Sequence, residues 1–249
     1  MKSLSSLAST ARDPKFRPTV ILLVATPLMM CWRYYGSRDY FAEHITQWMP
    51  AQMVPADWMP GGTDLQHAAA VFQFLTCFAL LGLIPALILR CGYRERLRDY
   101  GLCVGDPRKT ALSLLILSPV FLVAGYLGSQ DPEVAQAFPI NPRAGDSAGM
   151  FVMHGATYLL FYLGWEFCFR GFLLFGLRDS LGDANAILVQ TMASTLLHIG
   201  GPAAEAFGAI LGGILWGWLA LWSRSLLSGL AQHYLLGISL DYFLCFHDS

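Results

Sequence analysis

The chain alternates between long apolar stretches and short polar connections. Most of the apolar stretches approach or reach the roughly 20 residues that an α-helix needs to cross a bilayer. The pattern therefore predicts an all-α fold, a polytopic membrane helical bundle with about seven transmembrane helices. The predicted segments are 18–32, 68–89, 111–128, 148–177, 184–199, 203–222 and 225–246.

Composition supports a membrane protein. Of the 249 residues, 55% are apolar and 13% are charged, whereas about 25% of the residues of a soluble domain are charged. The net charge of -1 leaves no basic surface for a phosphate backbone, so we expect no nucleic acid partner. The six cysteines show no C-x-x-C spacing, which indicates neither a disulfide framework nor a zinc site.

Basic residues gather mainly at alternate connections between the segments. By the positive-inside rule, this pattern predicts a cytoplasmic N-terminus, a cytoplasmic 90–110 loop and an outward C-terminus. We expect an integral membrane protein of the cell (plasma) membrane. Residues 33–67 contain Trp48, Trp58 and several prolines, and are predicted to form an irregular segment at a membrane interface; an ordinary loop is the alternative.

Ionisable side chains inside the apolar segments need an explanation, because a charge in hydrocarbon costs at least about 2.5 kcal/mol. Glu166 and Arg170 are four residues apart, which places both on one face of a helix. They either form a structural ion pair or take part in chemistry. His154 lies near the outer end of its segment and is not counted as a candidate. The embedded residues considered are Glu166, Arg170, His198, Glu205, His233 and Asp241.

Three of these residues suggest a hydrolase. Helical rise places Glu166, His198 and His233 at depths where they can meet inside a hydrocarbon core of about 30 Å. A carboxylate within hydrogen-bonding distance of a neutral imidazole can deprotonate a water molecule.

Structural interpretations compete with this one. His198 precedes a Gly-Gly-Pro helix stop and can simply bond to a helix end. Glu205 lies in the first turn of its segment, where an acid complements the helix dipole. Asp241 follows His233 by eight residues and shares its face with Gly237, in a stripe that would line a cavity.

The order of these motifs resembles the CPBP family of intramembrane proteases, which includes the CAAX prenyl endopeptidases and bacteriocin-processing homologues. The resemblance rests on Glu166-x-x-x-Arg170-Gly171, on His198 closing the next segment, and on His233 in the last. It starts at the fourth segment. We therefore predict two regions, an N-terminal membrane region with about three spans (1–147) and a CPBP-like intramembrane protease bundle (148–249).

The resemblance also implies roles for individual residues. In the family, the first Glu of an E-E-x-x-x-R motif works with the second-motif His to activate water, and the His and Asn of a final H-x-x-x-N motif support the oxyanion. By position, Glu166 matches the second Glu and Arg170 the motif Arg. His198 matches the second-motif His, and His233 the last-motif His.

This sequence departs from the family pattern at two positions. Trp165 stands where the family has its first Glu, and Gly237 stands where it has the final Asn. Either Glu166 takes the catalytic role, or the chain is not a peptidase. We favour the first, because a scaffold has no reason to keep Glu166, His198 and His233 at membrane depth.

The sequence thus predicts an intramembrane endopeptidase that hydrolyses a peptide bond of a membrane-associated protein or peptide. Glu166 and His198 would activate the water, and His233 would steady the oxyanion. The supporting residues are Arg170, which would orient Glu166, and Glu205 and Asp241. No cofactor is expected: two histidines and a glutamate suit zinc, but the chain has no H-E-x-x-H motif.

Two other functions stay open. One is a catalytically inactive CPBP-like binding protein, which Trp165 and Gly237 suggest. The other is a small proton-coupled transporter in which Glu166, Glu205 and Asp241 relay protons. Common transporters are built from inverted repeats, and none is visible in this sequence.

Overall fold

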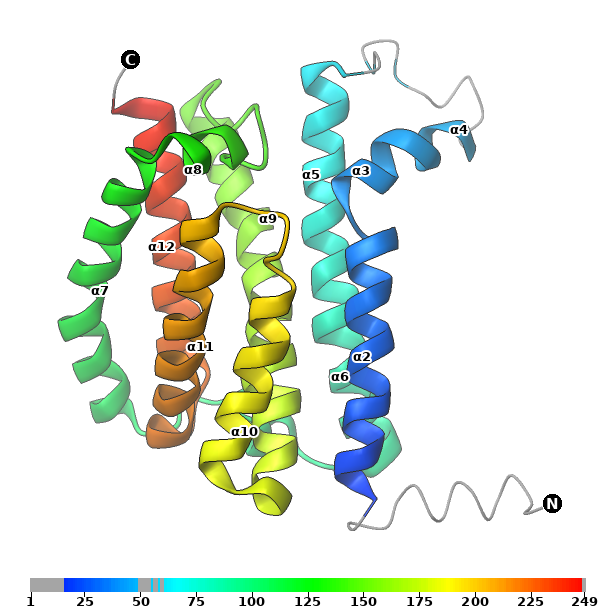
Figure 1. The fold of residues 1–249 in the computed structure, drawn as a ribbon, viewed down its shortest axis with the longest axis vertical. Helices are drawn as coiled ribbons and strands as arrows, with labels where there is room; N and C mark the ends of the chain where they lie inside the picture. The colour runs from blue at the N-terminus through cyan, green and yellow to red at the C-terminus, as the bar shows by residue number, and fades with distance from the viewer. Residues whose placement is uncertain (1–15, 49–54, 56–57, 59–60, 248–249) are drawn as a thin grey trace.

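The computed structural model describes residues 16–247, apart from 49–54, 56–57 and 59–60. Throughout this part of the chain the protein is an all-α bundle without β-strands (Figure 1). The long helical stretches are α2 (Arg17–Tyr35), α5 (Thr63–Cys77) continued by η3 (Phe78–Leu83), α6 (Ile84–Leu87) and η4 (Ile88–Tyr93), α7 (Pro107–Ser129), α9 (Ala148–Glu166) continued by η6 (Phe167–Phe175), α10 (Gly176–Leu196), α11 (Ala203–Ser223) and α12 (Leu227–Phe246). The short helices are α3 (Arg38–Tyr40), η1 (Phe41–Ile45), α4 (Thr46–Trp48), η5 (Leu97–Tyr100) and α8 (Pro132–Ala137).

The prediction of an all-α membrane bundle is confirmed. Every predicted apolar segment coincides, to within a few residues, with one of the long helices. Within the described residues, four helical stretches are long and apolar enough to cross a membrane, which makes this an integral membrane protein. They are Thr63–Tyr93, Pro107–Ser129, Ala148–Leu196 and Ala203–Ser223. The total of seven spans stays a prediction.

The expectation of an irregular segment at 33–67 is wrong for residues 33–35 (α2), 38–48 (α3, η1 and α4) and 63–67 (α5), which are helical. Residues 49–54, 56–57 and 59–60 of this segment lie outside the described residues. Ser37 starts the helical stretch 38–48, since its side chain accepts a hydrogen bond from the backbone N–H of Tyr40. Phe41 then packs against Leu65 at the start of α5. Apolar contacts with α5 therefore hold these residues in helical form, although the local sequence has no clear apolar periodicity.

Gly182 separates the predicted segments 148–177 and 184–199. Its φ of 76° and ψ of 160° interrupt the helical hydrogen bonding within α10, and a residue without a Cβ adopts this left-handed conformation at little cost. The chain reverses here, so that α9 and η6 run in one direction and the rest of α10 returns beside them (Figure 1).

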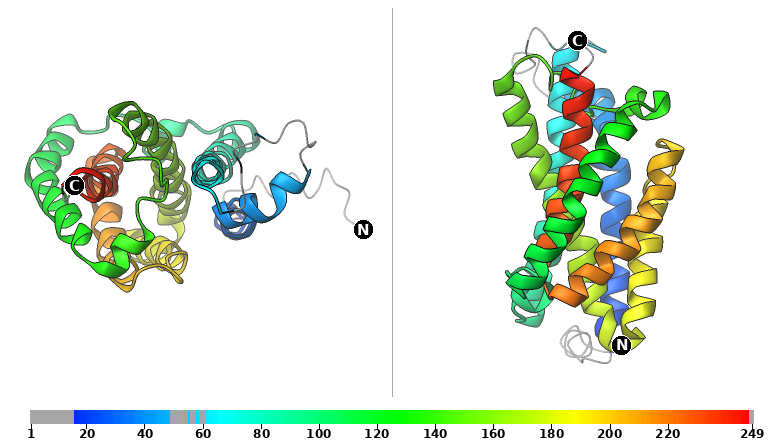
Figure 2. Two further views of the ribbon diagram at one scale, coloured as in Figure 1. Left: turned by 90° about the horizontal axis from the view of Figure 1, so that it is seen from above. Right: turned by 90° about the vertical axis from the view of Figure 1, so that its left-hand side faces the viewer.

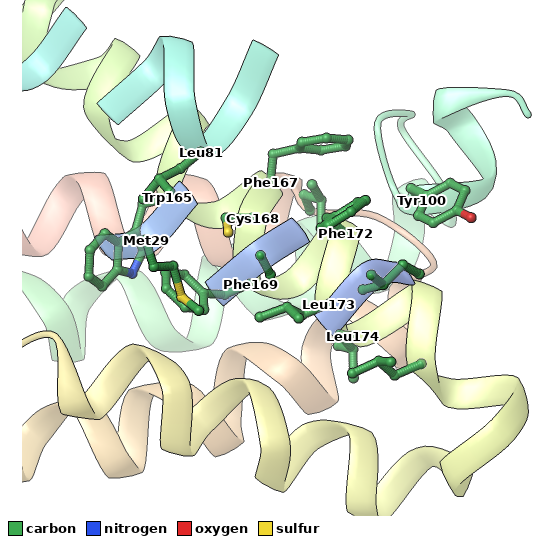
Figure 3. Close-up of a cluster of buried hydrophobic side chains, with 14 of the residues drawn as sticks. Met29, Leu81, Tyr100, Trp165, Phe167, Cys168, Phe169, Phe172, Leu173 and Leu174 are labelled. Atoms are coloured by element: carbon green, nitrogen blue, oxygen red, sulfur yellow. The ribbon is translucent and has the colours of Figure 1, made fainter. Parts of the chain in front are cut away.

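The stretch formed by α9 and η6 lies in the middle of the bundle. Viewed from above, α2 and α5 lie on one side of it and α7 and α12 on the other (Figure 2). The backbones of α5–η3 and α9 almost touch: a Cβ on Gly82 would lie 3.0 Å from Gly164 Cα, and one on Gly164 would lie 2.6 Å from Cys77 O. Trp165, Phe169 and Phe172 follow directly and fill the main apolar core (Figure 3).

The ends of the bundle agree with the predicted alternation of the segments. The start of α2 and the 94–106 connection lie at one end, and the end of α12 lies at the other (Figure 1). Which end faces the cytoplasm stays a prediction, and so does the division of the chain into 1–147 and 148–249.

Candidate functional site

Glu166 and Arg170 form a charged pair in the interior of the bundle. Glu166 ends α9, and Arg170 lies in the π-helical stretch that follows, η6. Their side chains are 1% and 2% exposed, and Arg170 Nη1 lies 3.1 Å from Glu166 Oε1. Glu166 Oε2 and two guanidinium nitrogens have no hydrogen-bond partner among the described residues. The ion pair expected from the spacing is present, and it does not use the full hydrogen-bonding capacity of either group.

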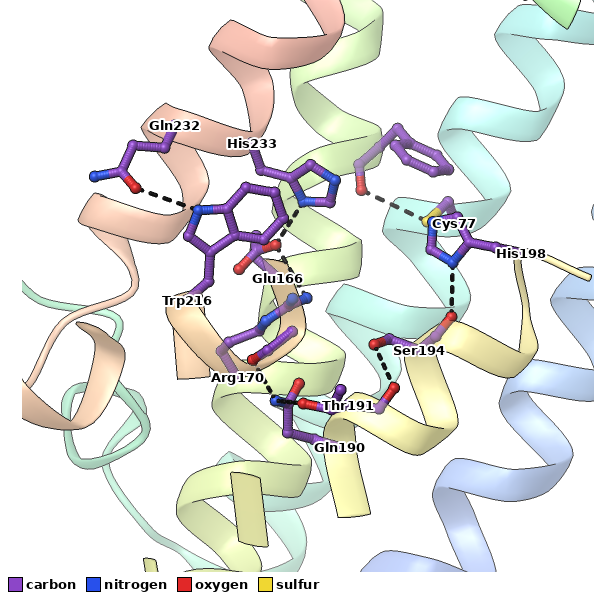
Figure 4. A network of polar contacts seen from close by, with 12 residues as sticks. Cys77, Glu166, Arg170, Gln190, Thr191, Ser194, His198, Trp216, Gln232 and His233 are labelled. Atoms are coloured by element: carbon purple, nitrogen blue, oxygen red, sulfur yellow. Dashed lines mark hydrogen bonds and ion pairs between the residues drawn. The ribbon is translucent and has the colours of Figure 1, made fainter. Parts of the chain in front are cut away.

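His233 on α12 contacts the same carboxylate. Its Nδ1 lies 2.7 Å from Glu166 Oε1 (Figure 4). A carboxylate beside Arg170 accepts hydrogen bonds and donates none, so the proton of this contact belongs to Nδ1. Nε2 of His233 then carries the lone pair, as it does in a histidine that acts as a base.

Aromatic rings fix the position of the imidazole. Trp216 on α11 stacks on His233 with 4.2 Å between ring centroids, and its Nε1 donates to Gln232 Oε1 at 3.2 Å. The Arg170 guanidinium lies 5.4 Å from the centroid of a Trp216 ring. Glu166, Arg170 and His233 thus share one ordered environment made by three helices (Figure 4).

His198 lies in the turn after α10 and has different neighbours. Its Nδ1 donates to Ser194 O at 2.8 Å, which leaves the lone pair on Nε2, 3.6 Å from Glu205 Oε1. Trp165 packs edge-on against the imidazole, with 5.3 Å between ring centroids. The side chain that replaces the family's first Glu therefore faces the second-motif His.

Two cavities reach these residues from different sides. One, of about 260 Å³, is lined by Trp165, His198 and Glu205 together with residues of α2, α3 and the turn between α10 and α11. The other, of about 310 Å³, is lined by Glu166 together with apolar residues of the 101–104 connection and the start of α12. Neither a hydrogen bond nor an ion pair joins Glu166 to His198. The structure thus brings Glu166 together with His233, and not with His198 as the sequence led us to expect.

Asp241 does not belong to this group. Its Oδ2 lies 2.7 Å from Nε2 of His154, and both side chains are fully buried. His154 was not among the residues predicted from the sequence, because its pairing with Asp241 depends on how α9 packs against α12. The three embedded acids therefore lie beside three different histidines, and no chain of carboxylates connects them.

Sequence reasoning also missed the aromatic partners of the site. Trp216 and Tyr162 lie in apolar segments, where an aromatic residue is usually part of the packing. Tyr162 packs edge-on against His233 with 4.6 Å between ring centroids. The signal available in the sequence was the glycine one helical turn before His233 and the glycine one turn after it, Gly229 and Gly237. These glycines open that face of α12 to the neighbouring helices.

Among the described residues, no group of three or more His, Cys, Asp or Glu side chains is arranged to hold a metal ion. The expectation that the protein works without a cofactor stays a prediction.

The fold and this cluster define a polytopic membrane protein with an ionisable site inside its helical bundle. Residues 147–238 match the family model described as Type II CAAX prenyl endopeptidase Rce1-like. This match confirms, for residues 147–238, the resemblance to the CPBP family that the motifs predicted. Neither a curated protein nor a solved structure matches the chain.

Proposed function

We propose that the chain is an intramembrane endopeptidase that hydrolyses a peptide bond of a membrane-associated protein or peptide. The contact of 2.7 Å between Glu166 Oε1 and His233 Nδ1 is the main support. It holds an imidazole in the tautomer of a base, deep in a chain whose family is one of intramembrane proteases. The side chain of His233 is 15% exposed, so a water molecule can reach the imidazole.

In this proposal Glu166 orients His233, and Arg170 compensates the carboxylate charge. The oxygen of a water molecule bonds to the substrate carbonyl carbon while one of its protons passes to His233 Nε2. That proton then moves to the leaving nitrogen as the C–N bond breaks. His198 is the second imidazole of the proposed site and lines the cavity of about 260 Å³. Glu205 supports the site through His198, whereas Asp241 pairs with His154 and takes no part in this step.

The test is hydrolysis of a quenched-fluorescent peptide by the purified protein in lipid vesicles, with prenylated and unprenylated peptides compared. We expect turnover by the wild type, loss of turnover in Glu166→Gln, and little change in Trp165→Glu. Trp165 points about 100° away from Glu166 around the helix, so a carboxylate at 165 does not replace the one at 166. Turnover by Glu166→Gln at the wild-type rate would contradict the proposal.

A second candidate function is peptide binding without hydrolysis. Trp165 favours it, because its ring covers the histidine that the family pairs with its catalytic Glu. In that case neither the wild type nor Trp165→Glu turns over the peptide, while both bind it with equal affinity. Restored turnover in Trp165→Glu alone would instead show that the substitution at 165 inactivated a protease.

We further propose that the protein lies in the plasma membrane with its N-terminus and the 90–110 loop in the cytoplasm. A cysteine placed at Arg96 in a cysteine-free variant should stay unlabelled by a membrane-impermeant thiol reagent in intact cells and react after permeabilisation. A cysteine at Glu133, in the opposite connection, serves as the matched control and should react in intact cells. Labelling of the cysteine at 96 from outside would reverse the topology.

A further inference from the structure

The face of α12 that carries His233 lacks side chains one turn away in both directions. A Cβ on Gly229 would lie 3.1 Å from Glu166 Oε2, and a Cβ on Gly237 would lie 2.0 Å from Tyr162 Oη. The opposing helix α9 therefore sends a carboxylate into one gap and a phenol into the other. Tyr162 and Glu166 are four residues apart, so they lie on the same face of α9 and approach His233 together.

The hydroxyl of Tyr162 takes the space that a side chain at 237 would need. The residue is 4% exposed, and its ring packs edge-on against the imidazole of His233. Two further tyrosines pack against it: the ring centroids of Tyr158 and Tyr234 lie 4.7 and 5.9 Å away, and Tyr158 is also a side-chain hydrogen-bond partner of Tyr162. A phenol O–H in such surroundings is a neutral donor that keeps its proton and can give a hydrogen bond beside the imidazole.

Hydrolysis at this site requires a donor that His233 does not supply at the start of the reaction. With Nδ1 bonded to Glu166, Nε2 of His233 carries the lone pair and accepts a proton from the water. The substrate carbonyl oxygen gains negative charge in the same step and needs a donor of its own. Gly237 has no side chain to offer one.

We propose that the Tyr162 hydroxyl is a catalytic residue that donates a hydrogen bond to this oxyanion, in the place that Gly237 leaves empty. The proposal rests on the proposed endopeptidase function. The hydroxyl keeps its proton throughout: the hydrogen bond shortens as charge develops on the oxygen and lengthens again when the C–N bond breaks. Loss of one such donor lowers kcat by about 10²–10³ in enzymes where it has been measured.

The experiment compares Tyr162→Phe with Tyr234→Phe in the vesicle assay. Each change removes one phenol hydroxyl within this aromatic group, and the hydroxyl of Tyr234 donates to Gly155 O at 3.1 Å, away from the imidazole. We expect kcat of Tyr162→Phe to fall by about 10²–10³ with KM unchanged, because the bond forms only in the transition state. Tyr234→Phe should keep the wild-type kcat, and the melting temperatures of both variants should match that of the wild type.

An exchange of positions keeps the test decisive if Tyr162→Phe fails to fold. Gly237→Asn alone should be inactive, because its Cβ meets the Tyr162 hydroxyl. Combined with Tyr162→Ala, the asparagine gains room and its amide replaces the lost donor, so the double variant should exceed Tyr162→Ala in kcat. Two results would overturn the role of Tyr162 without affecting the proposed endopeptidase function: a wild-type kcat in folded Tyr162→Phe, or a double variant no faster than Tyr162→Ala. If the wild type shows no turnover, both the role of Tyr162 and the endopeptidase function are wrong.

Discussion

Two histidine–carboxylate pairs join α9 to α12, and they differ in access rather than in contact. Glu166 with His233 and Asp241 with His154 have the same separation of 2.7 Å between nitrogen and oxygen. His154 and Asp241 are completely enclosed, and Phe74 and Phe151 pack against His154. This pair has no arginine beside it and lines neither of the two cavities described above.

The pair at the centre of the bundle is accessible. The side chain of His233 is 15% exposed, Glu166 lines a cavity, and Arg170 compensates the carboxylate charge. The hydrogen-bond distance therefore does not distinguish a chemical site from a structural contact in this bundle. What distinguishes the two pairs is access for a water molecule and the compensating charge of Arg170. These two features can be tested separately.

The largest expected difference between the pairs is in turnover. Glu166→Gln should lower kcat by about 10²–10⁴, the usual contribution of a positioned base and its partner. Asp241→Asn, the same acid-to-amide substitution in the enclosed pair, should leave kcat at the wild-type value in the vesicle assay. Equal losses in the two variants would remove the distinction drawn between the pairs.

Removal of the compensating charge should destabilise the protein. Arg170→Ala leaves Glu166 as an uncompensated buried charge, with an expected loss on the order of 3–5 kcal/mol of the free energy of unfolding. Thermal unfolding in detergent measures it. Combining Arg170→Ala with Glu166→Gln should recover most of the loss, because no buried charge then remains. Wild-type stability of Arg170→Ala would show that the ion pair is not required.

The enclosed pair should be replaceable by apolar side chains. His154→Phe combined with Asp241→Leu should leave the free energy of unfolding unchanged or raise it by about 1–4 kcal/mol, the range found when buried ion pairs are replaced by apolar side chains. The melting temperature should not fall below that of the wild type, and kcat should stay at the wild-type value. A loss of turnover in a stable double variant would assign the enclosed pair a part in the chemistry.

The smallest effect is expected for a charged cluster at the end of the bundle. Arg17 Nη1 lies 2.8 Å from Glu95 Oε1, with side chains 22% and 30% exposed, and the Tyr100 hydroxyl donates to Glu95. Burial raises the pKa of Tyr100, so it stays a donor over the whole working range of pH. Glu95→Gln should cost about 0.2–1 kcal/mol of stability, as for exposed ion pairs, with turnover unchanged. A loss as large as that of Arg170→Ala would mean that exposure does not set the size of these effects.

Most of the helical bundle could be predicted from the sequence, and so could the ionisable residues of the site, but not their contacts. Ionisable side chains are costly in hydrocarbon, so their presence in apolar segments identified Glu166, Arg170, His198 and His233 before any of their contacts were known. Which acid meets which histidine was not predictable, because it depends on the register and rotation of helices far apart in the chain. Asp241 shows this, since its partner is on the fourth predicted segment rather than on its own helix.

The helical form of residues 38–48 escaped prediction for a related reason. Its apolar partners belong to α5, beyond a connection rich in proline and glycine, so the local sequence gave no periodic signal. Trp216 and Tyr162 were missed because an aromatic residue in an apolar segment has the same pattern whether it fills the core or holds an imidazole.

The backbone contact between Gly82 and Gly164 has a consequence for how the protein's specificity can change in evolution. With no side chain between them, the two helices interlock at the residue that directly precedes Trp165 and Glu166. A turn of α9 about its own axis would bring a side chain into the space that Gly164 leaves free, so positions 165 and 166 cannot exchange their neighbours. Specificity at these positions can therefore change only by replacing the side chains, while the helix backbones stay in place. In a mutant library selected for function, we expect no residue larger than glycine at position 82 or 164.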